Sequence, residues 1–412
     1  MKPPARGAAR LLSGAGLAAA LLLPAAVPAH TAPHTGMPTA DGKKGQELPA
    51  MPSSLDPEAE EANCTAASRE KAQKQDWSRQ RLDLDRLHGH GTGAGVTVAL
   101  IDTGVAPDAA GLDGRVTAAG AAADDCVGHG TFLAGLIAGT GSSLAGVAPG
   151  ARILALRGTD TRGEPSPALV AEAVREATEA GAEVIAVTVA LPRRDTDLTR
   201  AVADARRAGA VVVAAATPDP PSRGGTDEIP SRVYWPAGEP GVLSVADMLP
   251  GGVRPDNSLP TTGIDLAAPG AGVVSGGPRG DGHYLGAGAS VAAAYAAGSA
   301  AVVRAAYPDD PPDAVTRRLT ATAYPADIPQ LDAYAAVTTV LGGSGGAAGA
   351  ERAADRVTVR DTAAADRAVD RATLFLLLGS AAVLTVLWAA FTLPRARARG
   401  WRPARAGGSS ED

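Results

Sequence analysis

Between residues 93 and 341, short apolar runs alternate with longer segments that have a helical pattern. The apolar runs are residues 96–101, 153–156, 184–189 and 211–216, and the helical segments are residues 167–180 and 198–208. Strands that are apolar along their whole length are buried on both faces, and strands that alternate with helices pair in parallel. The pattern therefore predicts an α/β fold, in which a mainly parallel sheet is flanked by helices on both faces. In such folds the sites lie at the carboxyl ends of the strands.

The N-terminus has the layout of a signal peptide. Basic residues among the first ten precede an apolar run over residues 15–27, and the small-residue sequence Val-Pro-Ala follows at residues 27–29. This order is typical of exported chains, and the apolar run is too short to span a bilayer. We expect residues 1–29 to direct export and to be removed.

A second apolar segment, residues 372–393, carries no charged side chain. A helix of this length, at ~1.5 Å per residue, matches the ~30 Å hydrocarbon core of a bilayer. Several arginines follow from residue 395 onward, and such basic clusters stay on the cytoplasmic side. We therefore expect a single-pass protein of the cell membrane. The basic tail, residues 394–412, would lie in the cytoplasm and the bulk of the chain outside it.

The segments between these two ends differ in composition. Residues 30–81 form an N-terminal arm, whose first half is rich in Pro, Ala and Thr and lacks apolar periodicity. Residues 342–371 begin with Gly-Gly-Ser-Gly-Gly and then become charged, which is typical of a flexible linker. The expected folded domain is residues 82–341.

Charge and ligand spacing exclude several classes of function. The net charge is -6, and no long basic tract occurs outside the extreme C-terminus. The electrostatic footprint of a nucleic-acid-binding protein is therefore missing. The histidines show no metal-ligand spacing with the cysteines, so we expect neither a metal site built from these side chains nor a cofactor. The sequence does not decide whether backbone oxygens bind calcium.

The chain has two cysteines, Cys64 and Cys126, and both lie in the part expected outside the cytoplasm. An oxidising compartment lets a disulfide persist, so we expect the two to pair. Two free thiols are the alternative, because the sequence does not show that the sulfur atoms meet.

Three segments place reactive side chains beside predicted strands or helices. Asp102 ends an apolar strand, His129 begins an apolar helix of small residues, and Ser290 begins another such helix. Taken singly, each has a commoner structural use, because Asp favours turns and Ser caps helices. The start of a helix also offers free N–H groups, which would stabilise an oxyanion beside Ser290.

Taken together, the three residues predict a catalytic triad. A nucleophilic serine needs a base to take its proton and a carboxylate to orient that base. The chain order Asp, His, Ser is the order found in subtilisin. We expect Asp102 to orient His129, His129 to transfer the proton, and Ser290 to attack a peptide bond of a protein or peptide substrate.

The segments around these residues resemble the active-site blocks of the subtilisin-like serine protease family, peptidase S8. Two further segments agree, since residues 146–151 resemble the family's block before a core strand and residues 265–270 its block upstream of the nucleophile. The similarity covers about residues 82–341. It implies a subtilisin-like fold.

Within this family the chain resembles the mycosins, membrane-anchored proteases associated with type VII secretion systems. The resemblance is carried by Cys126 just before His129, by an arm that contains Cys64, and by the C-terminal apolar segment. It implies that the arm wraps the catalytic domain and is pinned by a Cys64–Cys126 disulfide. It also implies a role in processing secreted substrates or in stabilising the secretion membrane complex.

Two departures from the family pattern bear on activity. Pro218 stands where sequence matching places the Asn that completes the oxyanion hole, and proline has no side-chain donor. Loss of that donor lowers turnover about 10²–10³-fold. The substrate-binding strand reads Thr188-Val189-Ala190 in place of Ser-Leu-Gly, and the added methyl groups would crowd a substrate that pairs with this edge.

Two other functions fit parts of the sequence. A non-catalytic scaffold of a secretion complex would need the fold and the membrane span but not the chemistry, and the loss of the oxyanion Asn favours it. An aspartic protease would use Asp102-Thr103-Gly104, but it needs a second such triplet or a dimer. The chain has no second Asp-Thr-Gly, and this interpretation leaves His129 and Ser290 unexplained.

Overall fold

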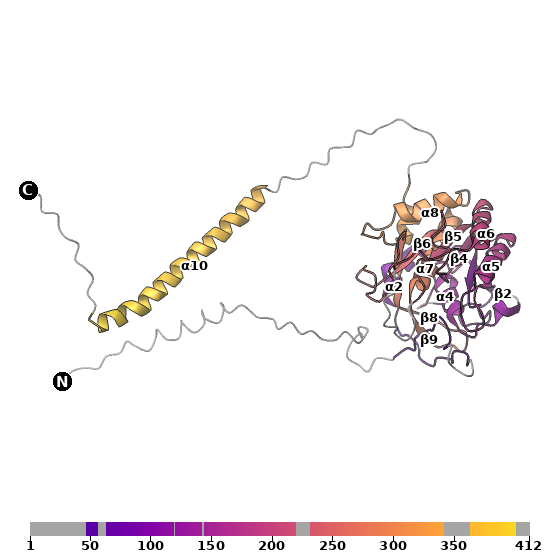
Figure 1. The fold of residues 1–412 in the computed structure, drawn as a ribbon, viewed down its shortest axis with the longest axis horizontal. Coiled ribbons are helices and arrows are strands. Elements are labelled where there is room, and N and C mark those ends of the chain that lie inside the picture. Colours follow the sequence, from indigo (N-terminus) through magenta and orange to yellow (C-terminus); the bar gives the residue numbers. More distant parts are fainter. Residues whose placement is uncertain are drawn as a thin grey trace, which may run out of the picture. The chain divides into compact units, whose positions relative to one another are not determined.

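The computed structural model describes residues 47–56, 63–118, 120–141, 144–219, 231–341 and 363–400. The chain divides into two units, one that ends at Leu341 and one that begins at Gly342 (Figure 1). The expected signal peptide, most of the expected linker and the tail from residue 401 lie outside the described residues.

The first unit is built around a parallel sheet, which has seven strands within the described residues, in the order β2-β3-β1-β4-β5-β6-β7. The strands are β1 (Thr97–Asp102), β2 (Val116–Ala118), β3 (Arg152–Arg157), β4 (Val184–Val187), β5 (Val211–Ala215), β6 (Leu243–Met248) and β7 (Leu266–Pro269). Every neighbouring pair runs parallel. Strands β4 to β7 are buried along their whole length, which confirms the predicted fold class.

Helices cover both faces of this sheet. They are α4 (His129–Ala138) and α7 (Ala289–Ala306) on one face, and α5 (Pro167–Glu179) and α6 (Thr196–Arg207) on the other. Val98 and Leu100 of β1 lie in the core that contains α4 and α7. Ala99 and Ile101 lie in the core that contains α5 and α6. Because successive side chains of a strand point to opposite faces, each central strand contributes to both cores.

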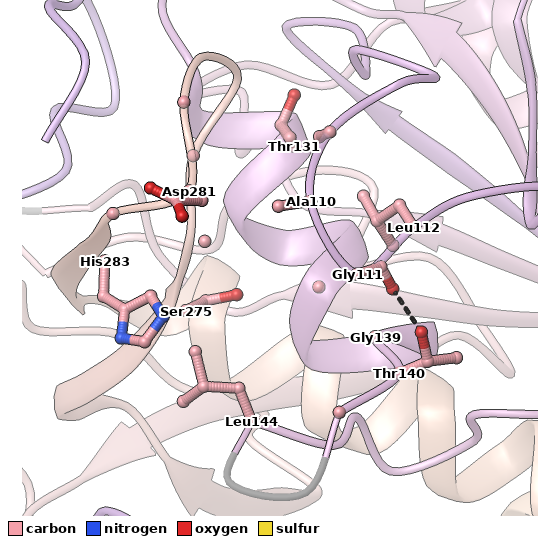
Figure 2. A pocket seen from close by; sticks show the side chains of 17 residues that line it. Ala110, Gly111, Leu112, Thr131, Gly139, Thr140, Leu144, Ser275, Asp281 and His283 are labelled. Atoms are coloured by element: carbon pink, nitrogen blue, oxygen red, sulfur yellow. Dashed lines mark hydrogen bonds between the residues drawn. The ribbon is translucent and has the colours of Figure 1, made fainter. Parts of the chain in front are cut away.

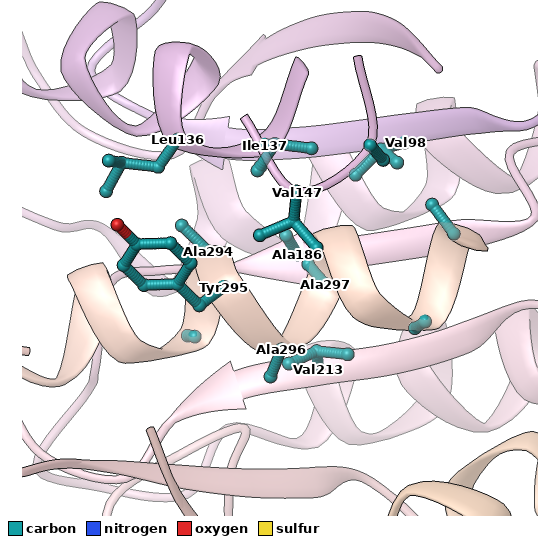
Figure 3. Close-up of a cluster of buried hydrophobic side chains, with 14 of the residues drawn as sticks. Val98, Leu136, Ile137, Val147, Ala186, Val213, Ala294, Tyr295, Ala296 and Ala297 are labelled. Carbon is teal, nitrogen blue, oxygen red and sulfur yellow. The ribbon is translucent and has the colours of Figure 1, made fainter. Parts of the chain in front are cut away.

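Helix α7 is the centre of the larger core. All of its residues from Ala289 to Val303 are buried, and their small side chains allow close packing. A Cβ added at Gly298 would lie 2.8 Å from the Cβ of Val147. Figure 3 shows α7 side chains between Leu136 of α4 and Val213 of β5. The helix is long and apolar enough to cross a membrane, but 83% of it is buried, so it is a core helix.

Shorter elements surround this core. They are α2 (Trp77–Arg81), α3 (Leu84–His88), η1 (Gly120–Ala123), β8 (Ala271–Gly276), β9 (His283–Ala287), α8 (Pro312–Ala321) and α9 (Ala333–Thr338). Strands β8 and β9 form a separate antiparallel pair. Two helices, α8 and α9, add their apolar residues to the core of α4 and α7.

The described part of the N-terminal arm packs along the domain. The N–H of Met51 donates a hydrogen bond to the carbonyl of Leu285 in β9. Cys64 forms a disulfide with Cys126 in the loop before α4. The disulfide that the mycosin resemblance implies is therefore present, and it ties the arm to the segment that carries His129.

The second unit contains a single described helix, α10 (Ala363–Ala398). Its segment Leu376–Arg395 has a mean hydropathy of 2.1, and none of it is buried. Leu378, Trp388 and Phe391 are among its exposed apolar side chains. A continuous apolar surface of this size is unfavourable in water, so α10 is a candidate membrane span at the place where the sequence predicts one.

Candidate active site

Three side chains from separate elements meet at the carboxyl edge of the sheet. Asp102 is the last residue of β1, His129 the first of α4, and Ser290 the second of α7. Nδ1 of His129 lies 2.9 Å from Oδ1 of Asp102, and Nε2 lies 3.2 Å from Oγ of Ser290. All three residues are buried. The structure thus joins the three predicted residues in one chain of hydrogen bonds.

Asp102 is held as an ionised acceptor. Its Oδ1 accepts a hydrogen bond from the N–H of Thr103 at 2.7 Å, and its Oδ2 accepts one from the hydroxyl of Thr188 at 2.5 Å. Burial alone would raise the pKa of this carboxyl group. The nearby His129 and the hydrogen bonds outweigh burial, so the pKa of Asp102 lies below its usual value. A charged Asp102 in this position favours the imidazolium form of His129.

A buried carboxyl group that the sequence analysis did not single out fixes the start of α4. Asp125 accepts hydrogen bonds from the N–H groups of Gly128 and Thr131 and from the hydroxyls of Thr103 and Thr131. Burial raises its pKa despite these donors. Because Thr103 follows Asp102 directly, Asp125 connects the end of β1 to the helix that begins with His129. Its neighbour in the chain is Cys126 of the disulfide.

Another carboxyl group contacts the serine directly. Oδ1 of Asp219 accepts a hydrogen bond from the N–H of Ser290 at 3.1 Å, and Oδ2 accepts one from its hydroxyl at 2.5 Å. The same Oδ2 lies 3.2 Å from Nε2 of His129. The loop after β5 turns so that Asp219, the residue after Pro218, brings its side chain to Ser290. The assignment of Pro218 to the oxyanion position stays a prediction.

His129 consequently lies between two carboxyl groups. Burial lowers the pKa of its imidazole, but the charges and hydrogen bonds of Asp102 and Asp219 raise that pKa well above its usual value. The site therefore binds a proton firmly. A protonated His129 cannot accept the proton of a serine hydroxyl.

Comparison with known proteins identifies the family of the chain. Residues 93–371 match the Subtilase family, Peptidase_S8. The chain belongs to the subtilase family. Mycosin-1 of Mycobacterium tuberculosis is 34% identical over 302 residues, which cover 60% of this chain and 68% of that protein. Mycosin-3 of the same organism is 32% identical over 358 residues, which cover 68% of this chain and 75% of that protein.

A solved structure described as MycP3 protease from the type VII (ESX-3) secretion system shares the fold of this subtilase. The TM-score is 0.58 at 29% sequence identity, and the match covers 73% of this chain and 100% of that one. The likeness confirms the predicted subtilisin-like fold and the predicted similarity to mycosins.

The predicted substrate-binding strand of this subtilase follows β4. Thr188 is buried, and its hydroxyl donates a hydrogen bond to Oδ2 of Asp102. This polar group therefore helps to hold the carboxyl group of Asp102 in place. The side chain of Val189 packs against the core of α5 and α6, and Ala190 is buried. Contact of these three residues with a substrate stays a prediction.

No group of three or more His, Cys, Asp or Glu side chains that would hold a metal ion occurs in the described part of this subtilase. A cavity of about 180 Å³ lies beside α4 and the β8–β9 pair, and none of the three triad residues lines it (Figure 2). Two of the residues that line the cavity, Ser275 and Thr140, donate their hydroxyl hydrogen bonds to the carbonyls of Phe132 and Gly111. Neither hydroxyl is therefore left as an unpaired donor for a ligand.

Proposed function

We propose that this chain is a mycosin-like serine endopeptidase that hydrolyses peptide bonds through Asp102, His129 and Ser290. The observation that carries the proposal is the continuous hydrogen-bonded path from Asp102 through His129 to Ser290. The family membership and the buried position of all three side chains support it.

In this mechanism Ser290 attacks the carbonyl carbon of the scissile bond as Nε2 of His129 takes its proton. Asp102 then stabilises the imidazolium through Nδ1, without accepting the proton itself. His129 returns the proton to the leaving amine. Water then attacks the acyl group on Ser290 as His129 takes a proton from it, and His129 returns that proton to Oγ of Ser290 when the acyl group leaves. The N–H of Ser290, at the start of α7, would donate to the oxyanion in place of its present acceptor, Oδ1 of Asp219.

We further propose that the protein is anchored in the cell membrane by α10, with its catalytic domain outside the cytoplasm, and acts with a type VII secretion system. The apolar, unburied segment Leu376–Arg395 supports the anchor. The likeness to a MycP3 protease from such a system supports the partner. Substrates would then be exported proteins, met on the outer side of the membrane.

Cleavage of an unfolded protein substrate by the full chain in detergent micelles tests the proposed chemistry. Ser290→Ala removes the nucleophile, so we expect it to abolish cleavage. Ser299→Ala is the matched control, because Ser299 is buried in the same helix and its hydroxyl donates a hydrogen bond to the carbonyl of Tyr295, away from the three residues. It should retain activity. Cleavage that persists in Ser290→Ala would contradict the assignment.

A second function, a non-catalytic scaffold of the secretion complex, is favoured by one observation. The Asp219 carboxyl group occupies the space beside Ser290 where an oxyanion donor is needed. A secretion assay distinguishes the scaffold function from the protease function. If Ser290→Ala secretes as well as the wild type while deletion of residues 363–400 stops secretion, the scaffold role is the required one.

A further inference from the structure

We propose that Asp219 is a catalytic residue of this site, whose protonated carboxyl group donates to the oxyanion and whose ionised form blocks the reaction. The proposal rests on the proposed protease function and gives that site a built-in dependence on a single proton. It assigns a role to a side chain that no sequence pattern singled out.

The contacts of Asp219 place it among the reacting atoms. Its two oxygens accept hydrogen bonds from the N–H and the hydroxyl of Ser290, and one of them is also in contact with Nε2 of His129. Its side chain is only 6% exposed. Gly288 makes room for it, because a Cβ at that position would lie 2.0 Å from Oδ1 of Asp219. Gly288 also has a φ of +131°, which a larger side chain rarely adopts.

The ionised carboxylate opposes catalysis in two ways. A carboxylate accepts hydrogen bonds and donates none. It competes with His129 for the hydroxyl proton of Ser290. It also accepts the hydrogen bond of the Ser290 N–H, which the oxyanion would need. An oxyanion that formed beside it would meet a like charge in a buried, low-dielectric site.

The protonated carboxyl group has the opposite effect. Its O–H donates one hydrogen bond to the oxyanion, which takes the place of the amide donor usual at such a position. Its loss of charge also removes one of the two negative groups beside His129, which favours the neutral imidazole that accepts the proton of Ser290. During attack that proton moves from Oγ to Nε2, and the proton of Asp219 stays on its oxygen.

Other charged groups face Asp219 from neighbouring elements. Asp247 of β6 is buried, and burial together with the negative charge of Asp219 raises its pKa. Arg254 lies 3.7 Å from Asp247 and partly offsets this charge. Asp102 faces the other side of His129. Asp219 and Asp247 repel one another when both are ionised, so the surroundings of Asp219 carry excess negative charge.

The contacts of Asp219 allow two arrangements of one proton. With the proton on Asp219 and a neutral His129, the site holds both a base and an oxyanion donor. With the proton on His129, as an ion pair with the Asp219 carboxylate, the site holds neither and is inactive.

The rate at which a fluorophosphonate probe labels the full chain, measured across pH, tests this proposal. The adduct places an oxygen at the oxyanion position, so labelling reports that site as well as Ser290. Asp219→Asn supplies a donor that cannot ionise. We expect it to label faster than the wild type, by on the order of 10²-fold.

Asp219→Ala separates the two effects, because it removes the charge without supplying a donor. We expect it to label about 10²-fold more slowly than Asp219→Asn. Equal rates for the two variants would overturn the donor role. Thermal unfolding of each variant confirms that it is folded, and Ser290→Ala gives the background.

The remaining outcomes each decide a point. A labelled wild type whose rate and pH profile are unchanged in Asp219→Asn overturns the role of Asp219 and leaves the proposed protease function standing. Labelling of Asp219→Asn with none of the wild type supports the role of Asp219 and favours the scaffold function. Folded protein that remains unlabelled in both forms at every pH overturns both proposals.

Discussion

At the residue scale, His129 has a carboxyl group on each ring nitrogen, with Asp102 at Nδ1 and Asp219 at Nε2. Asp102 alone would orient the ring and stabilise the imidazolium that forms during attack. A second carboxyl group at Nε2 also stabilises the imidazolium before attack begins. The position of a single proton therefore decides whether the site is ready for reaction.

This arrangement predicts a pH dependence of stability. The pKa of His129 in the folded protein is raised well above its usual value of 6.5 by Asp102 and Asp219. Protonation of His129 then stabilises the fold fully below about pH 6.5, and this contribution is lost as pH rises through the higher folded pKa. We expect the melting temperature of the wild type to fall across that interval. His129→Gln should remove this part of the slope, and an unchanged slope would contradict the electrostatic account.

The meeting of Asp102, His129 and Ser290 could be predicted from the sequence because each of them stands in a recognisable motif at the end of a strand or the start of a helix. Asp219 could not, because its motif differs from the family pattern and the register of a loop is not fixed by hydrophobic periodicity. Matching residue by residue placed Pro218 at the oxyanion position. The structure places the Asp219 side chain, not that of Pro218, in contact with Ser290, and sequence matching does not reveal which side chain of a loop points inward.

At the element scale, the strands and helices with strong patterns were predicted to within two residues at either end. Strands β3 and β5 and helices α5 and α6 lie close to their predicted bounds, because their apolar runs are uninterrupted or their helical period is clear. Strands β6 and β7 and the β8–β9 pair were not predicted. Alanine, glycine and proline are frequent in several of these segments, and such residues carry little strand preference.

The Cys64–Cys126 disulfide predicts a further property at this scale. It closes a loop with a sequence separation of 62, and a crosslink of this span stabilises a fold by about 2–5 kcal/mol. Cys126 also follows Asp125, which holds the end of β1 and the start of α4. We expect Cys64→Ser with Cys126→Ser to lower the free energy of unfolding, measured with urea, and to lower the labelling rate of Ser290.

The matched control for this prediction is reduction with dithiothreitol. The wild type should lose stability on reduction, and the double variant should be insensitive to it. Equal stability of the oxidised and reduced wild type would show that the arm adds nothing to the fold through this bond.

At the scale of the whole molecule, the two units differ in whether their long apolar helix is buried or exposed. The first unit buries its longest apolar helix, α7, inside a core, whereas α10 exposes its apolar surface on every side. A tether to the membrane would hold the catalytic domain near exported substrates and raise their local concentration.

Membrane fractionation tests this arrangement. The full chain should remain in membranes after an alkaline carbonate wash, and a chain that ends at residue 341 should move to the soluble fraction. A tag after Asp412 should resist protease added to intact cells, because the basic tail is expected in the cytoplasm. Digestion of that tag would contradict the proposed orientation, and recovery of the full chain in the wash would contradict the anchor.

The identity of the residue that a fluorophosphonate modifies, read by tandem mass spectrometry of the labelled full chain, tests the central claim most directly. The account predicts an adduct on Ser290, in the wild type and more abundantly in Asp219→Asn. An adduct on a different residue, or none in either protein while both remain folded, would contradict it.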